Sequence, residues 1–214
     1  MKIYCVSGLG ADERVFTYLD LPDAELVFIK WIKPVKSESL SSYCKRLLVQ
    51  IDLEQEVNLI GVSFGGIICQ EFAKLINCKK IVIISSIKSR DEMSPQMKSV
   101  GKLGLHKILP NWFIKWSNLK TADMVFGTKT KEESTLLKNI INDTDFEFGR
   151  WAMDAIIKWE NPHKIKNLVH LHGTNDLIFP VQYISNALII SGGTHFMIVN
   201  KALEINKIIA AEMQ

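Results

Sequence analysis

The sequence lacks three features that would each assign it to a large class of proteins: a long apolar run, a concentrated run of one charge, and closely spaced cysteines. No stretch approaches the roughly 18 apolar residues that a membrane-spanning helix needs. The apolar run that follows Met1 is too short for a signal peptide. We therefore expect a protein with no membrane partner.

The excess of one charge over the other is also small. The chain carries 26 Lys and Arg residues against 23 Asp and Glu residues, which leaves a formal net charge of +3. Its lysines are scattered, with only short pairs such as Lys79 and Lys80. Proteins that bind nucleic acids normally concentrate basic side chains on one face. The sequence therefore predicts no nucleic-acid partner.

Cysteine is present but is not arranged in pairs. The four cysteines show no C-x-x-C spacing, and each lies in an apolar or helical context (Cys5, Cys44, Cys69 and Cys78). This pattern does not support a disulfide framework and indicates buried thiols of a cytoplasmic protein. No cluster of His and Cys has the spacing of metal ligands, so we expect no metal and no other cofactor.

The sequence does contain a regular alternation of short apolar runs and amphipathic patterns. Continuous apolar strands separated by amphipathic helices are typical of a parallel sheet with helices on both faces. The pattern thus predicts an α/β fold of three layers. The strands are expected at 2–8, 24–31, 57–62, 79–86, 167–173 and 187–193, and the helices at 11–19, 37–51, 64–76 and 200–213.

The alternation is interrupted by a mostly helical segment over residues 88–161. Its pattern places Leu136, Leu137, Ile140 and Ile141 on one apolar helix face. Large aromatic side chains in an insertion either pack in the insertion's own core or cover the mouth of a site. For any single aromatic side chain, core packing is the more frequent role. We interpret the four tryptophans of this segment as candidate substrate-binding residues (Trp112, Trp116, Trp151 and Trp159).

The stretch "LIGVSFGGIIC", residues 59–69, places one serine between closely spaced glycines. A predicted strand ends at Ser63 and a predicted helix begins after it, which is the setting of a nucleophile elbow. So tight a turn crowds the residues two before and two after the serine, and Gly61 and Gly65 lack the side chains that would clash. The hydroxyl is then expected at the carboxyl edge of the sheet, beside a helix N-terminus.

A serine hydroxyl needs a base to take its proton, and the base needs an acid to fix its tautomer. His195, in "ISGGTHFMI", and Asp176, in "HGTNDLIFP", each follow a predicted strand, although Asp176 also suits an ordinary turn. Parallel strands end at one edge, so Ser63, Asp176 and His195 are predicted to meet as a catalytic triad. The other four histidines are expected to be structural or at the surface (His106, His163, His170 and His172).

Two backbone N–H groups are predicted to form an oxyanion hole. The first belongs to Phe64, directly after the nucleophile. The second is assigned to Leu9 in the loop "SGLGADE", where the neighbouring glycines permit an unusual backbone path. A dinucleotide-binding role for this loop fails, because Glu13 occupies the third glycine position and no acidic residue ends the next strand.

With the motifs "VSGLG", "GVSFGG", "HGTNDLIFP" and "GGTHFM", the chain resembles the α/β-hydrolase superfamily over nearly its whole length. The resemblance implies Ser63 as nucleophile, Asp176 as acid and His195 as base. It also implies Leu9 and Phe64 as the oxyanion donors. A serine in the elbow, where the dehalogenase and epoxide-hydrolase branches carry an aspartate, argues against those branches.

The resemblance further implies a core made of residues 1–87 and 162–214, with residues 88–161 inserted as a helical cap. Many members begin with two extra strands for which this chain has no room, so a reduced sheet of about six strands is expected. The first loop often reads His-Gly in such proteins and reads Ser7-Gly8 here, which leaves the backbone donor available.

The hypothesis favoured by these patterns is a carboxylesterase-like serine hydrolase. It would cleave a small, largely apolar ester or related acyl substrate through an acyl-enzyme intermediate. One alternative is a ligand-binding or receptor-like protein on the same scaffold with little turnover. Another is non-hydrolytic chemistry on the same triad, such as a lyase reaction or cofactor-free oxidation. The sequence does not indicate the acyl group, the leaving group or the oligomeric state.

Overall fold

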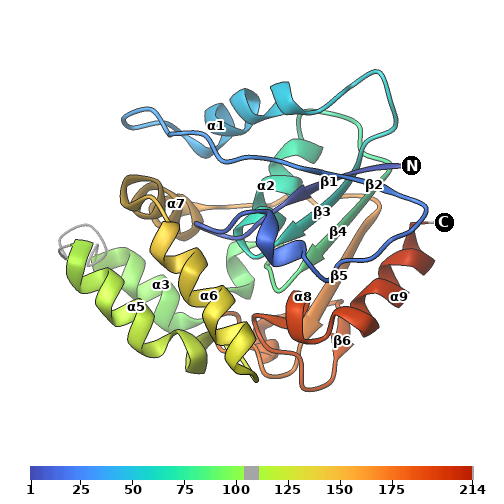
Figure 1. Ribbon diagram of the computed structural model, residues 1–214. Helices are drawn as coiled ribbons and strands as arrows, with labels where there is room; N and C mark the ends of the chain where they lie inside the picture. Colours follow the sequence, from blue (N-terminus) through green and yellow to red (C-terminus); the bar gives the residue numbers. More distant parts are fainter. Residues whose placement is uncertain (104–110, 214) are drawn as a thin grey trace.

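The computed structural model describes residues 1–103 and 111–213. At its centre lies one parallel sheet of six strands, in the order β2-β1-β3-β4-β5-β6 (Figure 1). This confirms the predicted α/β fold and its number of strands. The strands are β1 (Lys2–Val6), β2 (Glu25–Phe28), β3 (Asn58–Val62), β4 (Lys80–Ile84), β5 (Leu168–Gly173) and β6 (Leu188–Ile190).

The two faces of the sheet are buried by different elements, because successive side chains of a strand point to opposite faces. On one face Tyr4 and Val6 pack with buried side chains of α1 (Leu40–Leu47) and α2 (Phe64–Ala73). On the other face Ile3 and Cys5 pack with α8 (Met197–Asn200) and α9 (Ala202–Glu212). The expected three layers are therefore present.

One predicted helix is shorter than expected. The pattern over residues 11–19 yields only η1 (Glu13–Phe16), a single 3-10 turn capped by the carboxylate of Asp12. After Phe16 the chain turns at Thr17 and Tyr18 and again at Pro22 and Asp23 before it enters β2. Val15 and Phe16 still bury the apolar face that the periodicity indicated.

Between β4 and β5 the chain forms a group of helices, which lie together beside one end of the sheet (Figure 1). They are α3 (Pro95–Leu103), α5 (Asn111–Phe126), α6 (Lys131–Asp143) and α7 (Phe146–Lys158). The side chains of Thr130 and Asp145 cap α6 and α7 by accepting backbone N–H groups of their first turns. In the described part of the chain, no helix is both long enough and apolar enough to cross a membrane.

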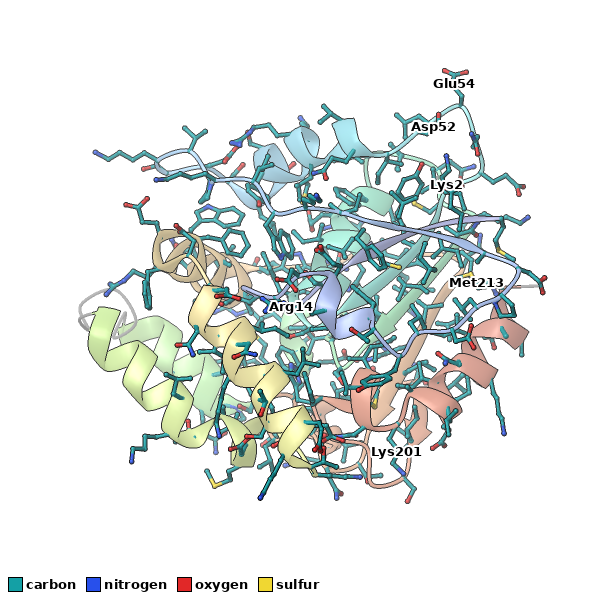
Figure 2. All side chains as sticks on the ribbon, viewed as in Figure 1. Lys2, Arg14, Asp52, Glu54, Lys201 and Met213 are labelled. Carbon is teal, nitrogen blue, oxygen red and sulfur yellow. The ribbon has the colours of Figure 1, made fainter. Side chains whose placement is uncertain are left out.

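The remaining short elements connect these layers. The 3-10 turn η2 (Leu48–Gln50) extends α1, and η3 (Arg90–Glu92) begins the helical insertion. The turn η4 (Val181–Tyr183) lies between β5 and β6. Arg14 of η1 pairs with Asp12 and also with Asp143 at the end of α6, so the first loop and the insertion are linked at the surface (Figure 2).

Candidate active site

Ser63 occupies the turn between β3 and α2 in a backbone conformation that is rare for a residue with a side chain. Its φ is 53° and its ψ is −117°. Such a conformation costs on the order of 1–3 kcal/mol and persists only where the surroundings impose it. Here the Ser63 N–H donates to the carbonyl oxygen of Ile84 at 2.9 Å, and the hydroxyl of Ser86 donates to the Ser63 carbonyl oxygen at 2.7 Å.

The two glycines of the elbow have the steric role that the sequence predicted. A methyl group at position 61 would lie 2.4 Å from the carbonyl oxygen of Gly65, so the residues two before and two after the serine do touch. A methyl group at position 65 would lie 2.0 Å from the carbonyl oxygen of Val6. Any side chain at either position would force β1, β3 and α2 apart.

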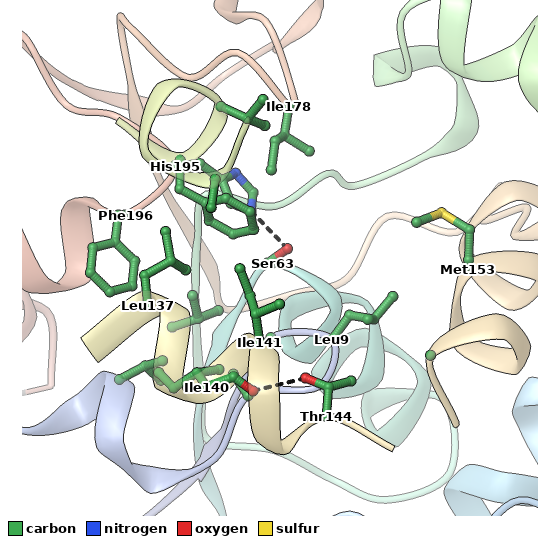
Figure 3. A pocket seen from close by; sticks show the side chains of 18 of the residues that line it. Leu9, Ser63, Leu137, Ile140, Ile141, Thr144, Met153, Ile178, His195 and Phe196 are labelled. Atoms are coloured by element: carbon green, nitrogen blue, oxygen red, sulfur yellow. Dashed lines mark hydrogen bonds between the residues drawn. The ribbon is translucent and has the colours of Figure 1, made fainter. Parts of the chain in front are cut away.

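Ser63, His195 and Asp176 form one continuous chain of hydrogen bonds. The His195 Nε2 atom lies 2.9 Å from the Ser63 hydroxyl oxygen (Figure 3). His195 Nδ1 lies 2.8 Å from the Asp176 Oδ2 atom. Because an ionised carboxylate only accepts hydrogen bonds, Nδ1 carries the proton and Nε2 is left to accept one from the serine. The structure thus brings together the three side chains that the sequence selected.

Asp176 is buried, yet its environment favours the ionised form. Burial alone would raise the pKa of this carboxyl, but its interactions with His195 and a hydrogen bond from the Phe179 N–H lower the pKa overall. The second carboxylate oxygen, Oδ1, accepts the N–H groups of Ile178 and Phe179, both at 2.9 Å. The acid therefore has a fixed orientation toward the imidazole.

The loops that carry the acid and the histidine are joined to each other through their backbones. The Asn175 N–H donates to the carbonyl oxygen of Gly193 at 2.8 Å, and a methyl group at Gly173 would lie 2.2 Å from that same oxygen. The His195 ring also contacts the rings of Phe126 and Phe179, with ring centroids 5.5 and 5.6 Å away. These contacts restrict the orientation of the imidazole.

The histidines expected to be structural take no part in this chain of hydrogen bonds, so far as the structure describes them. His172 is buried beside the acid, with its Nε2 atom 3.9 Å from the Asp176 Oδ2 atom, and its Nε2–H donates to the Phe179 carbonyl oxygen at 2.8 Å. His170 is also buried, and burial lowers its pKa to about 3, so it is neutral at ordinary pH. His163 is exposed, whereas His106 lies outside the described residues.

The two expected oxyanion donors lie on segments that meet at the serine. Phe64 is the first residue of α2, and Leu9 lies in the loop after β1. That loop approaches Ser63 closely, because a methyl group at Gly8 would be 3.4 Å from the Ser63 Cβ atom. Within residues 1–103 and 111–213, neither the Leu9 nor the Phe64 N–H has a hydrogen-bond acceptor.

Ser63 opens into a cavity of about 440 Å³ that lies between the sheet edge and the helical insertion (Figure 3). Its walls are almost entirely aliphatic and aromatic. Arg150 and the hydroxyls of Thr121 and Thr144 are the polar side chains that the insertion adds to this lining. Apolar lining residues include Leu9, Val15, Ala122, Val125, Phe126, Leu137, Ile140, Ile141, Met153, Ile156, Ile178 and Phe196.

The expectation that the tryptophans of the insertion line this cavity is wrong for Trp151 and Trp159. The Trp151 indole packs against the tilted ring of Tyr43, with ring centroids 4.3 Å apart, and donates to the Glu38 carbonyl oxygen at 2.9 Å. The buried Trp159 indole donates to the Glu71 carboxylate at 2.7 Å. Both side chains therefore link α7 to the helices α1 and α2, which cover the sheet, and line a separate hollow beside these helices. The side chains of Trp112 and Trp116 lie outside the described part of the structure.

The residues that do form the wall were visible in the sequence as a helix face, but not as a binding site. Leu137, Ile140 and Ile141 were expected on one apolar face of the insertion, and the structure turns that face toward Ser63. Thr144 and Thr194 had no signal in the sequence, because a threonine after a helix or before a histidine is commonplace. Among the described residues, no group of His, Cys, Asp and Glu is arranged to hold a metal ion.

Comparisons with known proteins place this geometry within a fold. No protein-family model matches the chain, and no curated protein is similar to it in sequence. Solved structures are similar over nearly the whole length. A lipase-esterase related protein from Clostridium acetobutylicum has a TM-score of 0.70 at 19% identity, over 97% of this chain and 92% of that chain.

A thermophilic esterase from Thermogutta terrifontis has a TM-score of 0.73 at 16% identity, over 100% of this chain and 89% of that one. A bromoperoxidase from Bacillus anthracis has a TM-score of 0.71 at 18% identity, over 99% and 91% of the two chains. The protein therefore has the α/β-hydrolase fold, as the resemblance implied. At these identities the likeness concerns the fold alone, and the chemistry must be argued from the site.

Proposed function

We propose that this protein is a serine hydrolase that cleaves small, largely apolar esters or related acyl compounds through an acyl-enzyme. The observation that carries the proposal is the hydrogen-bonded chain from Ser63 through His195 to Asp176, at the floor of an apolar cavity. A nucleophile, an oriented base and an ionised acid in this order are what acyl transfer requires.

The reaction follows from the positions of the protons. As the Ser63 oxygen forms a bond to the acyl carbon, its proton passes to His195 Nε2, and the carbonyl oxygen becomes an oxyanion. The N–H groups of Phe64 and Leu9 stabilise that charge. The intermediate then releases the alcohol, which takes the proton from His195, and leaves the acyl group on Ser63. Asp176 stabilises the imidazolium throughout.

Water completes the cycle by the reverse sequence of transfers. His195 takes a proton from the water molecule as its oxygen attacks the acyl carbon. The second tetrahedral intermediate releases the carboxylic acid, and the proton on His195 returns to the Ser63 oxygen. One ester and one water molecule are thereby converted to one acid and one alcohol, with the protein unchanged.

The cavity supports a substrate of limited size and low polarity. A cavity of about 150 Å³ lined by aliphatic side chains binds one benzene molecule. The 440 Å³ here therefore corresponds to on the order of 15 to 20 non-hydrogen atoms. We include in the proposal that residues 88–161 act as the cap over this site, that the substrate is a free small molecule, and that the protein works in the cytoplasm.

A fluorophosphonate probe tests this proposal directly. We expect the wild-type protein to be labelled at Ser63, and we expect it to hydrolyse p-nitrophenyl esters of short and medium acyl chains. Ser63→Ala should remove the labelling and lower kcat by about 10⁶-fold, to the level of the uncatalysed background. Modification at another residue, or ester hydrolysis that survives Ser63→Ala, would refute the mechanism. Tight binding of esters without turnover would instead support the ligand-binding alternative.

A second candidate function is cofactor-free oxidation, which is favoured by the similarity to a structure described as a bromoperoxidase. The two candidates differ in their co-reactants. Hydrolysis consumes only water, whereas bromination consumes hydrogen peroxide and bromide. Bromination of a phenol by the wild-type protein at a rate exceeding its ester hydrolysis would favour the second candidate.

A further inference from the structure

The loop that carries Leu9 is a tight turn whose geometry depends on one glycine. The Ala11 N–H donates to the Gly8 carbonyl oxygen at 3.0 Å, which closes a four-residue turn from Gly8 to Ala11. Gly10 is the third residue of this turn and has a φ of +67°. Turns with a positive φ at this position favour glycine, because other residues meet a steric penalty there. We call residues 8–11 the oxyanion turn.

Two side chains of the core hold the far end of the oxyanion turn. The Ser7 hydroxyl donates to the Ala11 carbonyl oxygen at 2.7 Å, and the Trp31 indole N–H donates to the same oxygen at 2.8 Å. Trp31 is itself stacked on Phe64, with ring centroids 5.6 Å apart. These bonds fix Ala11, but they leave the Gly10 carbonyl to another partner.

That partner comes from the helical insertion. Thr144 is the residue that ends α6, and its hydroxyl oxygen lies 2.9 Å from the Gly10 carbonyl oxygen and 3.0 Å from the Ile140 carbonyl oxygen. The hydroxyl thus lies between the last turn of its own helix and the oxyanion turn. Figure 3 shows Thr144 near Leu9, on the side of Ser63 where Ile141 also lies.

Shape complementarity accompanies the hydrogen bond. A methyl group at Gly10 would lie 2.3 Å from the Thr144 Cγ2 atom and 2.5 Å from its hydroxyl oxygen. The threonine therefore fills the space that the missing side chain of Gly10 leaves. One side chain of the insertion both packs on the oxyanion turn and bonds to it.

We propose that Thr144 is a positioning residue for the oxyanion hole, so that the helical insertion sets the rate of acyl transfer as well as the shape of the cavity. This inference rests on the proposed function. The Gly10 carbonyl belongs to the residue directly after Leu9, and a shift of the turn moves the Leu9 N–H relative to Ser63. Misplacement of a catalytic group by about 1 Å can cost on the order of 100-fold in rate.

The proposal predicts a particular kinetic signature. The oxyanion exists only in and near the transition state, so a displaced donor lowers kcat and kcat/KM together and leaves KM unchanged. A threonine that only stabilised the fold would lower the thermal midpoint and leave kcat unchanged at temperatures well below it.

The experiment compares variants at position 144 with a control on the same helix. Thr144→Val and Thr144→Ala remove the hydroxyl, and Thr144→Ser retains it. Thr135→Val is the matched control, because the Thr135 hydroxyl also bonds to a carbonyl one turn earlier on α6 but faces solvent. Rates are measured on p-nitrophenyl esters and as second-order labelling by a fluorophosphonate, with thermal midpoints alongside.

We expect Thr144→Val and Thr144→Ala to lower kcat and the labelling rate about 10- to 100-fold, with KM unchanged. Thr144→Ser and Thr135→Val should behave as the wild type. The proposal is overturned if the valine and alanine variants keep full kcat, or if the serine variant is equally slow. A wild-type protein that neither hydrolyses esters nor reacts with the probe would instead refute the proposed function itself, and with it this inference.

Discussion

The sheet edge and the helical insertion meet at the same cavity but contribute different things to it. The edge supplies Ser63, Asp176 and His195, which are held by backbone hydrogen bonds and close backbone contacts. The described part of the insertion supplies aliphatic walls from α5, α6 and α7. Under the proposed function, the sheet edge thus provides the reactive groups and the insertion provides the surface that would contact the substrate.

The division is not complete, and the points where the insertion contacts the catalytic loops are informative. Gly127, which follows α5, has a φ of +72°, and its carbonyl oxygen accepts the Thr194 hydroxyl at 3.2 Å, directly beside His195. Thr144 makes the corresponding contact with Gly10, beside Leu9. Two of the loops that border the cavity, the one with Leu9 and the one with His195, are thus each in contact with one helix end of the insertion through a threonine and a glycine.

The largest effect should come from the sheet edge. Asp176→Asn preserves size but replaces an oxygen that accepts from His195 with a group that can donate, which favours the wrong imidazole tautomer. We expect kcat to fall about 10⁴-fold, with the fold intact, as measured by ester hydrolysis and circular dichroism.

A variant in the insertion serves as the comparison for Asp176→Asn. Trp151→Phe removes the bond to the Glu38 carbonyl oxygen and should lower the free energy of unfolding by about 1 kcal/mol while leaving kcat unchanged. A Trp151→Phe variant that loses activity as strongly as Asp176→Asn would contradict the separation of reactivity from selectivity.

A smaller effect is expected from the cavity wall. Ala122 is buried on α5 and lines the cavity, so Ala122→Leu places extra carbon atoms where a substrate chain would lie. The preferred acyl chain should become shorter by about two or three carbons, and kcat/KM for the best wild-type ester should fall about 10- to 100-fold. A series of p-nitrophenyl esters of increasing chain length measures both.

Met124→Leu provides the control on the same helix, since Met124 is exposed and does not belong to the lining. It should leave the chain-length profile unchanged. An unaltered profile in Ala122→Leu would mean that the substrate does not use the α5 side of the cavity.

The last prediction concerns the stability of the core and leaves activity aside. The pKa of His170 is lowered to about 3 by burial, whereas an unfolded histidine titrates near pH 6.5. Between these values the unfolded chain binds one more proton than the folded chain. The stability that neutral His170 contributes is therefore fully present above about pH 6.5 and is lost as the pH falls toward 3. The expected loss is about 1.4 kcal/mol per pH unit.

Urea unfolding between about pH 5 and pH 7 measures this slope, and His170→Leu should reduce it by about one proton. His163→Leu is the control, because His163 is exposed on the segment that enters β5. If the slope is the same in His170→Leu as in the wild type, the histidine does not titrate as its burial indicates.

The residues at the sheet edge were predictable from the sequence because local patterns indicate them. Each strand is a short apolar run, and parallel strands end at one edge, so residues that follow three strands must lie near one another. Gly61 and Gly65 were recognisable for a similar reason, since only a sharp turn requires both. Ser63 could therefore be matched with Asp176 and His195, which lie more than a hundred residues further along the chain.

The cavity wall was not predictable in the same way. Periodicity identifies an apolar helix face but does not say whether that face packs on the core or on a cavity. Trp151 and Trp159 were misjudged because their indole N–H groups donate to acceptors just before α1 and on α2, a pairing between distant segments with no local signature. Thr144 was missed because its importance depends on the φ of Gly10.

The burial of the four cysteines has a practical consequence for measuring ligand binding in this cavity. All four are unpaired and buried, and burial raises the pKa of the Cys78 thiol to about 11, with the other three higher still. Maleimide dyes react with exposed thiolates, so the native chain offers them no ready target. A single exposed thiol made by Met124→Cys would carry a fluorophore on α5, one residue before the cavity-lining Val125. Occupancy of the cavity could then be followed in real time as a change in emission, separately from turnover.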